Sequence, residues 1–174
     1  MKVTTIYAPE KRERELFKWA VRITMGDKKK PSEPTSELIE ACLNARHSPI
    51  RVLNFAFLIE EIPSNTATHF ARHVHAVPFV SSLRNDRQEK IDGDLAPRNT
   101  PVDMILYCNA EELMTIANKR LCMKASEKTR EAAQMICEAA AKAMPEIEKF
   151  LVPMCEYHGG VCHEITSCGK CTKG

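Results

Sequence analysis

The run of residues 52–59 (VLNFAFLI) constrains the fold of this chain more than any other stretch. It is apolar on both faces of an extended strand, a pattern that is typical of strands in the middle of a sheet. We therefore expect a central β-strand that is covered on both faces. Pro63 ends this strand, and Ser64 is a suitable cap for a helix that follows it. With 174 residues, of which 44% are apolar, the chain is long enough to bury such a strand in one domain.

Two segments ahead of this run have clear patterns. Residues 3–7 alternate in polarity and predict a first strand, whereas residues 11–24 carry apolar side chains at helical spacing. Gly26 is a plausible stop for that helix. Ser36 can cap a second helix, which ends before Pro49 because proline disfavours helical geometry in the residue that precedes it.

The second half of the chain predicts mainly helices. Residues 100–103 have the cap, first-turn proline and acidic third residue of a helix start. Residues 109–112 give a second capping pattern, so we expect either one long kinked helix or two short ones. Ser126 can cap a later helix, and Pro145 begins a further turn. The Met, Ala and Cys stripes of these helices are interpreted as core packing.

Charge and composition exclude several classes of protein. A formal net charge of +2 does not favour a protein that coats a nucleic-acid polymer. The sequence has no run of about eighteen apolar residues, the length of a membrane span. Residues 1–7 have the pattern of a strand rather than the apolar core of a signal peptide. We expect a cytoplasmic protein with no membrane segment and no nucleic-acid polymer as a partner.

Residues 68–87 concentrate the polar chemistry of the chain, with three His, three Arg and two Ser. The segment begins as a helix and continues past Pro78 in an extended form, so side chains from two backbone directions can converge on one ligand. Arginine binds phosphate through two parallel hydrogen bonds, and histidine can donate or accept near neutral pH. These residues predict a site for a phosphorylated ligand, with Ser82 and Arg84 at its far end. The alternative is a solvated basic helix followed by an ordinary loop.

The spacing of these residues resembles a known signature. Arg72-His73, followed by Ser82-Leu83-Arg84, is similar to the Arg-His-Arg, seven residues, Ser-x-Arg motif of the flavin-dependent thymidylate synthases. The turn at residues 47–49 resembles the family's His-containing turn ahead of its Phe-rich strand. Residues 109–130 resemble its Asn-initiated helix and the arginines that follow. The resemblance covers residues 46–153, so we expect a domain at residues 1–153 and a separate Cys-rich tail at residues 154–174.

The resemblance implies an α+β fold in which a mixed or antiparallel sheet is packed with long helices. It also implies a homotetramer whose active sites are shared between subunits. The implied enzyme is a methyltransferase that uses FAD, with NADPH and methylenetetrahydrofolate as co-substrates. A one-carbon unit passes from the folate to C5 of dUMP, and flavin hydride completes the methyl group. A pyrimidine deoxynucleotide and a folate are therefore the implied partners.

The resemblance also assigns roles to single residues. The nucleotide is held by Ser82 and Arg84, and Arg120 orients the pyrimidine ring. The residues assigned to FAD are His47, Ser48, Arg72, His73 and Asn109. Simpler roles exist for three of these eight: His47 can end a helix, Asn109 can act as an N-cap, and Arg120 can be a surface charge.

The sequence departs from the family at several places, one of which is His69, where many members have Gln. Val74 stands where the family has Arg, and Val80 stands where it has Glu. The segment before Asn109 is also shortened and lacks an arginine, for which Arg87 or Arg98 could substitute. Two alternatives stay open as a result. The scaffold could act on a different pyrimidine nucleotide or make a different C5 modification, or the protein could be a non-catalytic nucleotide-binding or zinc-stabilised protein.

The eight cysteines fall into two groups. Cys42, Cys108, Cys122 and Cys137 lie singly in apolar patterns and are expected to be small buried hydrophobes. The other four crowd the tail, where short Cys-x-x-Cys and Cys-x-x-His spacings are typical of zinc ligands. The candidate ligands are Cys155, His158, Cys162, Cys168 and Cys171. The alternatives are a disordered tail with free thiols, cysteines that pack singly on the core, or a redox pair formed by Cys168 and Cys171.

Overall fold

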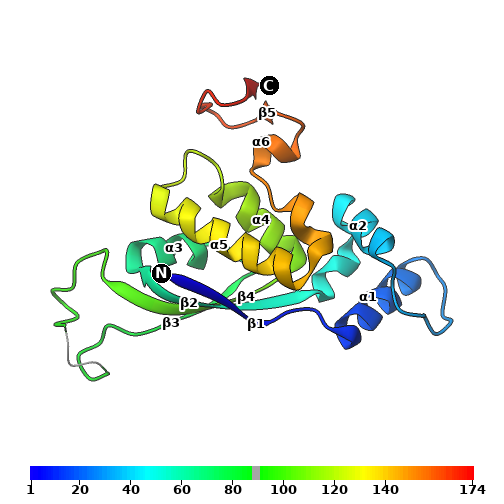
Figure 1. The fold of residues 1–174 in the computed structure, drawn as a ribbon, viewed down its shortest axis with the longest axis horizontal. Coiled ribbons are helices and arrows are strands. Elements are labelled where there is room, and N and C mark those ends of the chain that lie inside the picture. The colour runs from blue at the N-terminus through cyan, green and yellow to red at the C-terminus, as the bar shows by residue number, and fades with distance from the viewer. Residues whose placement is uncertain (88–90) are drawn as a thin grey trace.

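The computed structural model describes residues 1–87 and 91–174. Its main feature is a four-stranded antiparallel sheet that carries helices on one face, which confirms the expected α+β class (Figure 1). The strand order across the sheet is β1-β2-β4-β3. The four strands are β1 (Lys2–Tyr7), β2 (Asn54–Pro63), β3 (Val77–Val80) and β4 (Pro101–Asn109).

Three helices, α3, α4 and α5, lie across the upper face of the sheet, while α1 and α2 lie beyond the end of β1 (Figure 1). The α1 helix has the bounds that the sequence predicts. The helices, including the 3₁₀ helices η1 and η2, are α1 (Lys11–Thr24), α2 (Ser36–Asn44), η1 (Ser48–Val52), α3 (Ser64–Ala71), α4 (Ala110–Arg120), α5 (Glu127–Ala143) and η2 (Pro145–Phe150).

The core lies between the sheet and the helices. Phe55, Phe57 and Ile59 of β2 are fully buried and point toward the helices, as do Met104 and Leu106 of β4. Burial of each such side chain stabilises the fold by about 1.5–3 kcal/mol relative to exposure. The central position predicted for residues 52–59 is thus confirmed, and the run begins in η1 before the chain becomes extended.

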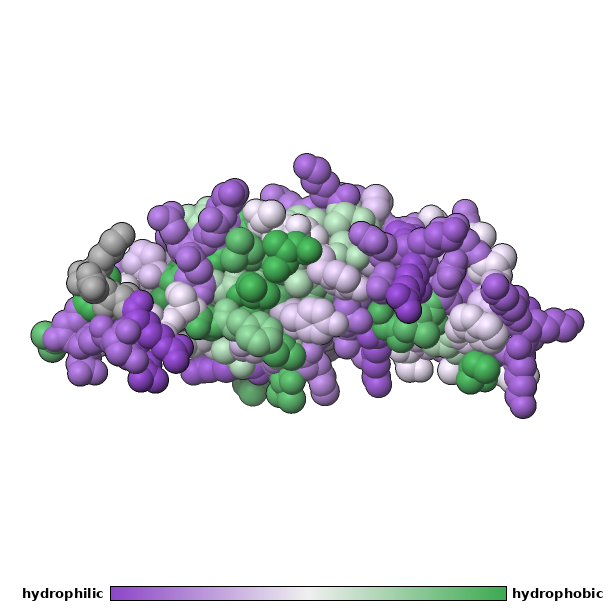
Figure 2. All heavy atoms as spheres, turned by 90° about the horizontal axis from the view of Figure 1, so that it is seen from below, coloured by the Kyte–Doolittle hydropathy of each residue, from purple (hydrophilic) through white to green (hydrophobic). Residues whose placement is uncertain are grey.

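The opposite face of the sheet differs from the expectation, because no described helix covers it. Cross-strand pairing aligns one apolar row of Leu58, Ile105 and Phe79 and a second of Ala56, Tyr107 and Val77. Figure 2 shows this face as a continuous apolar area in the middle of the molecule. The prediction that the central strand is covered on both faces is therefore wrong for the isolated chain. We call the area the apolar underside, and its members are Tyr7, Leu58, Val77, Phe79, Ile105 and Tyr107.

The helix predicted to begin at residues 100–103 is a strand instead. Val102, Met104, Leu106 and Cys108 alternate with outward-facing residues, and all four face the core. Pairing with β2 is available to this segment along its whole length, and Pro101 is tolerated because it is the first residue of the strand. The second capping pattern is correct: Asn109 Oδ1 accepts a hydrogen bond from the Glu112 backbone N–H at 2.9 Å, and α4 begins there.

Two of the predicted caps are displaced by one residue. Thr35, not Ser36, caps α2, because the Ser36 hydroxyl donates to Glu146 Oε1 at 3.2 Å. Ser64 is the first residue of α3 rather than its cap, and its hydroxyl donates to the Arg98 carbonyl at 2.8 Å. Ser126 caps α5 as expected. In each displaced case a tertiary contact takes the hydroxyl that local sequence assigns to the cap.

The chain ends in a small substructure on the side of the helices away from the sheet (Figure 1). It contains α6 (Met154–Tyr157) and two short strands, β5 (Val161–Cys162) and β6 (Thr172–Lys173), which pair in parallel. Salt bridges and hydrogen bonds attach it to α4 and to the loop that follows α4. Among the residues that the structure describes, no helix is long and apolar enough to cross a membrane.

Candidate active site

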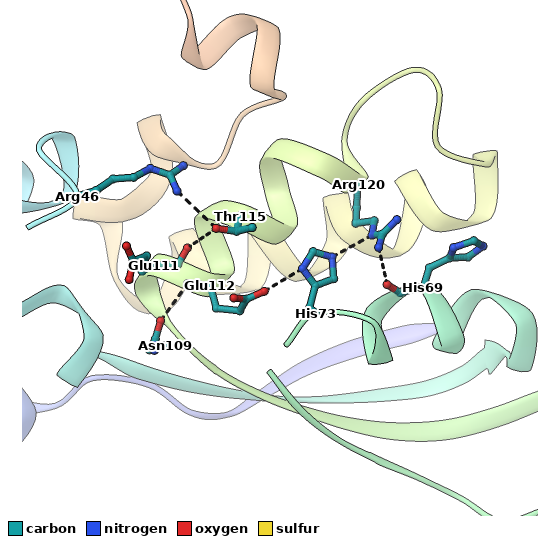
Figure 3. A network of polar contacts seen from close by, with 8 residues as sticks. All are labelled: Arg46, His69, His73, Asn109, Glu111, Glu112, Thr115 and Arg120. Atoms are coloured by element: carbon teal, nitrogen blue, oxygen red, sulfur yellow. Dashed lines mark hydrogen bonds and ion pairs between the residues drawn. The ribbon is translucent and has the colours of Figure 1, made fainter. Parts of the chain in front are cut away.

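The α4 helix is the frame of the candidate site (Figure 3). Its N-cap, Asn109, lies at the end of β4, and its last residue, Arg120, lies beside the end of α3. Between them, Glu112 is turned toward the His73 segment below the helix. The strand-to-helix junction thus fixes one end of the site and the last turn of α4 fixes the other.

A buried polar network joins α4 to the segment that follows α3. His73 Nδ1 lies 2.9 Å from Glu112 Oε1, and Arg120 Nε donates to His73 Nε2 at 3.0 Å. Since Nε2 accepts, the proton of the neutral ring must be on Nδ1, which donates to the carboxylate. His73 and Glu112 are 8% and 5% exposed, so the imidazole bridges a carboxylate and a guanidinium away from water.

Burial lowers the pKa values of two residues of this network, and neighbouring positive charge adds to both shifts. Burial is the main cause that lowers the pKa of His73, and the charge of Arg120 acts in the same direction. The hydrogen bond to Glu112 opposes this shift without reversing it. Burial also lowers the pKa of Arg120, and the nearby charge of Arg72 adds to that effect. The ring of His73 is therefore held neutral near pH 7, as its hydrogen bonds require.

Arg72 and Arg120 form a positively charged spot. Arg120 Nη2 donates to the His69 carbonyl at 2.8 Å, while the exposed Arg72 has no acceptor among the residues that the structure describes. The two guanidinium groups are close enough for Arg72 to disfavour the charge of Arg120. An anionic ligand would relieve this repulsion, and phosphate fits two guanidinium forks well. The interpretation of Arg120 as a plain surface charge does not fit this geometry.

Ser82 and Arg84 lie in a loop beyond the far end of β3. Arg84 donates to both carboxylate oxygens of Asp86 at 2.9 Å, and its backbone N–H donates to Ser82 Oγ at 3.2 Å. Residues 82–86 and 93–94 line an open hollow of about 620 Å³ at the surface. Gly93 closes the other side, where its N–H donates to Asn85 Oδ1 at 2.6 Å.

The two halves of the motif are therefore separated. Arg72 and His73 precede β3 and Ser82 and Arg84 follow it, and four residues of strand span about 13 Å. Within one chain the structure joins His73 to Arg120 but leaves Ser82 and Arg84 on a different part of the surface.

The turn at His47 and Ser48 lies near the opposite half of α4. Both residues are exposed, and the His47 N–H donates to the Cys42 carbonyl, so this residue also ends α2. The preceding Arg46 anchors the turn: its guanidinium lies 4.7 Å from the centre of the Tyr157 ring and donates to Asn118 Oδ1 at 2.5 Å. This cluster was not anticipated from the sequence.

Glu112 belongs to the candidate site, although the sequence analysis does not identify it. Its position three residues after Asn109 was interpreted only as part of a capping pattern. The signal that could have identified it is an acidic residue between apolar neighbours on the inner face of α4, next to Leu113 and Met114, where an unpaired carboxylate would be costly.

Comparison with known proteins gives a likeness at the level of structure alone. No protein-family model and no curated protein sequence match the chain. Two structures of the flavin-dependent thymidylate synthase ThyX from Helicobacter pylori, both with FAD and dUMP, match with TM-scores of 0.72 and 0.70 at 16% identity. They cover 87% of this chain and 100% and 97% of those chains. The UMP/dUMP methylase PolB from Streptomyces cacaoi, bound with 5-Br dUMP, matches with a TM-score of 0.67 at 16% identity, over 86% and 93% of the two chains. The chain thus has the fold of the flavin-dependent thymidylate synthases, shared with a nucleotide methylase.

Proposed function

We propose that this protein is an FAD-dependent, thymidylate-synthase-like methyltransferase that acts on C5 of dUMP. The observation that carries the proposal is an agreement between two independent features. The Arg72-His73…Ser82-x-Arg84 spacing resembles the motif of one family, and the fold that contains it is similar to structures of that same family. A cytoplasmic location is part of the proposal, because all the cysteines are free thiols.

The residues of the candidate site fit a flavin nucleotide. In our proposal Arg72, His47, Ser48 and Asn109 contact FAD. The guanidinium of Arg72, which is exposed and has no acceptor among the described residues, supplies a partner for the phosphates of FAD. FAD, reduced by NADPH, would supply hydride to a one-carbon unit taken from methylenetetrahydrofolate. His73 does not contact FAD directly in this proposal, because both of its ring nitrogens already form hydrogen bonds with Glu112 and Arg120.

The nucleotide would be held by arginine charge and by hydrogen bonds. Arg120 polarises the pyrimidine carbonyls, and its guanidinium is aimed by His73 and the His69 carbonyl. Ser82 and Arg84 bind the nucleotide from their own loop. Because that loop lies a strand length away from Arg72, a neighbouring subunit of a homotetramer would complete each site. The apolar underside supports such self-association, since exposed apolar areas of this kind mark interaction surfaces.

A second pyrimidine nucleotide is a specific alternative. Val80 stands where the family has Glu, and its hydrocarbon side chain has no carboxylate to make the family's acidic contact with the nucleotide. PolB is described as a UMP/dUMP methylase. UMP should therefore be assayed beside dUMP. A preference for UMP would favour the alternative in which the enzyme acts on a different pyrimidine nucleotide.

The test is release of tritium from C5-labelled dUMP and UMP in the presence of FAD, NADPH and methylenetetrahydrofolate. We expect release by the native protein and a loss on the order of 100-fold in Arg84→Gln. Arg12→Gln is the matched control, because Arg12 is an exposed arginine on α1. A folded protein that binds nucleotide and flavin but releases no tritium from either substrate would instead support the non-catalytic alternative.

A further inference from the structure

A small cavity at the end of the molecule opposite the sheet is lined by five of the eight cysteines. They come from separate segments: Cys122 follows α4, Cys155 lies on α6, Cys162 lies on β5, and Cys168 and Cys171 lie before β6. The cavity volume is about 20 Å³, which is enough for one water molecule or one ion. The expectation that Cys122 is a buried hydrophobe is wrong, since it is half-exposed at this cavity; Cys42, Cys108 and Cys137 are buried as expected.

The tail around this cavity has almost no core of its own. Within residues 154–174, all of which the structure describes, only Cys162 has a buried side chain. A segment that buries so little apolar surface does not recover the entropy of ordering from packing alone. Small substructures of this kind are usually ordered by a cross-link or a metal ion.

The backbone returns the cysteines to one place. Gly160 has φ of 93° between Cys155 and Cys162, and Gly169 has φ of 81° between Cys168 and Cys171. These left-handed turns need glycine and reverse the chain within each pair. The four thiols of the tail, from Cys155, Cys162, Cys168 and Cys171, therefore line one cavity.

The charges around the cavity suit a negatively charged metal cluster. A divalent ion with four thiolates has a net charge of −2, and Lys124 and Lys170 both line the cavity. Lys124 is held there by a hydrogen bond to the Thr166 carbonyl at 2.8 Å. The acidic residue of the lining, Glu164, is engaged by Lys119 at 3.4 Å.

We propose that Cys155, Cys162, Cys168 and Cys171 bind one structural Zn²⁺ as a tetrathiolate. Each thiol releases its proton to solvent as its sulfur–zinc bond forms, and the sulfurs close to about 2.3 Å from the ion. As the described side chains now stand, no three Cys, His, Asp or Glu groups have the spacing of a formed metal site, so the cavity contracts on binding. His158 leaves the predicted ligand set, because it is not part of the lining and its ring packs 4.9 Å from that of His163.

Bound zinc would also stabilise the end of α4. The tail is attached there by Lys119–Glu164 and Lys124–Thr166, and Arg120 is the last residue of that helix. The metal is therefore a structural element of this chain, and its presence does not depend on the methylation proposed above.

The experiment is a zinc-to-protein ratio, measured by plasma mass spectrometry on the full chain after reduction, addition of zinc alone and dialysis. We expect one zinc per chain in the native protein and loss of zinc in the Cys168→Ser/Cys171→Ser double variant. The matched control His158→Ala should retain zinc. Cobalt(II) in place of zinc should give the sulfur-to-metal charge-transfer absorption of a thiolate site.

Folding of each variant is checked by circular dichroism, since residues 1–153 carry the core and should fold without the tail cysteines. A reduced, folded native protein that binds no zinc would overturn the proposal. Wild-type zinc content in the double variant, or loss of zinc in His158→Ala, would overturn the tetrathiolate ligand set.

Discussion

His73 positions Arg120. Its ring accepts from Arg120 Nε on one side and donates to Glu112 on the other, so the three side chains act as one unit. A guanidinium aimed in this way loses little further freedom when it binds a pyrimidine carbonyl, which is the advantage of a preorganised donor. The resemblance to the family assigns His73 to the flavin, whereas its burial and its two hydrogen bonds favour a role in positioning Arg120, the arginine that we propose binds the nucleotide.

Removal of the Glu112 charge should weaken this unit. Glu112→Gln replaces a charge-assisted hydrogen bond by a neutral one in a buried site, so we expect the free energy of unfolding to fall by about 1–2 kcal/mol. The adjacent Glu111→Gln is the matched control, because Glu111 forms an ion pair with Arg51 at the surface. Loss of this ion pair should lower the free energy of unfolding by less than about 1 kcal/mol. Urea unfolding compares the two. Equal losses in both variants would contradict the buried role of Glu112.

The lowered pKa of His73 predicts a stability that depends on pH. In the unfolded chain the ring titrates near 6.5, and in the folded protein its pKa is lower. The unfolded state therefore binds the proton first, and stability falls as the pH drops below 6.5 toward the folded value. Glu146 acts in a separate, more acidic window, because Arg14 lowers the pKa of its carboxyl from 4.5.

We expect His73→Gln to flatten the slope of stability against pH below 6.5, with His75→Gln, an exposed neighbour, as the control. Thermal unfolding in a series of buffers of different pH measures this slope. An unchanged slope in His73→Gln would show that the ring is not held neutral by the fold.

At the scale of elements, residues 101–109 show where local sequence misleads. Their start has the cap and proline of a helix, and yet they form β4. The decisive interaction is non-local, because the residues of β4 pair with residues of β2 that lie 38 to 55 positions earlier in the chain. This pairing outweighs the local helix propensity. The alternation of Val102, Met104, Leu106 and Cys108 was visible in the sequence, but the capping signal masked it. The prediction that Asn109 is an N-cap is confirmed, because an N-cap depends only on a hydrogen bond with the first turn of the helix that follows it.

The loop that carries Ser82 and Arg84 depends on Gly93. A Cβ at Gly93 would lie 2.0 Å from the Leu83 carbonyl oxygen, so Gly93→Ala must displace the loop. We expect dUMP binding to weaken by about tenfold or more, because Leu83 lies between Ser82 and Arg84, which we propose bind the nucleotide. Titration calorimetry measures the affinity.

Gly26→Ala is the control for this loop, since nothing lies within 4 Å of a Cβ there and the backbone strain at φ 76° is far from the site. Gly26→Ala should lower stability without changing the nucleotide affinity. Full affinity in Gly93→Ala would contradict a nucleotide role for this loop.

At the scale of the whole molecule, the two motif halves and the apolar underside point to assembly. The sequence predicted the motif but not its separation by β3, because spacing along a chain does not report distance in the fold. It also predicted a central strand that is covered on both faces. In the isolated chain one of these apolar faces is left uncovered. A second copy of this chain on the underside would account for the uncovered face of the sheet.

Self-association should therefore depend on the underside. Phe79 is 60% exposed there, and Phe79→Glu would place a charge in the middle of an apolar contact. We expect sedimentation equilibrium to report an assembly of the native protein and smaller species of the variant. Leu16→Glu, at a similarly exposed residue of α1, should leave the assembly intact. A native protein that is monomeric at working concentrations would contradict this part of the account.

The flavin absorbance spectrum tests the central claim most directly. It is recorded across the near-ultraviolet and visible range before and after addition of FAD, and again after dUMP. The account predicts bound-flavin bands that shift when dUMP is added, with the shift lost in Arg84→Gln while the bands remain. A colourless protein that takes up no added FAD would contradict the account.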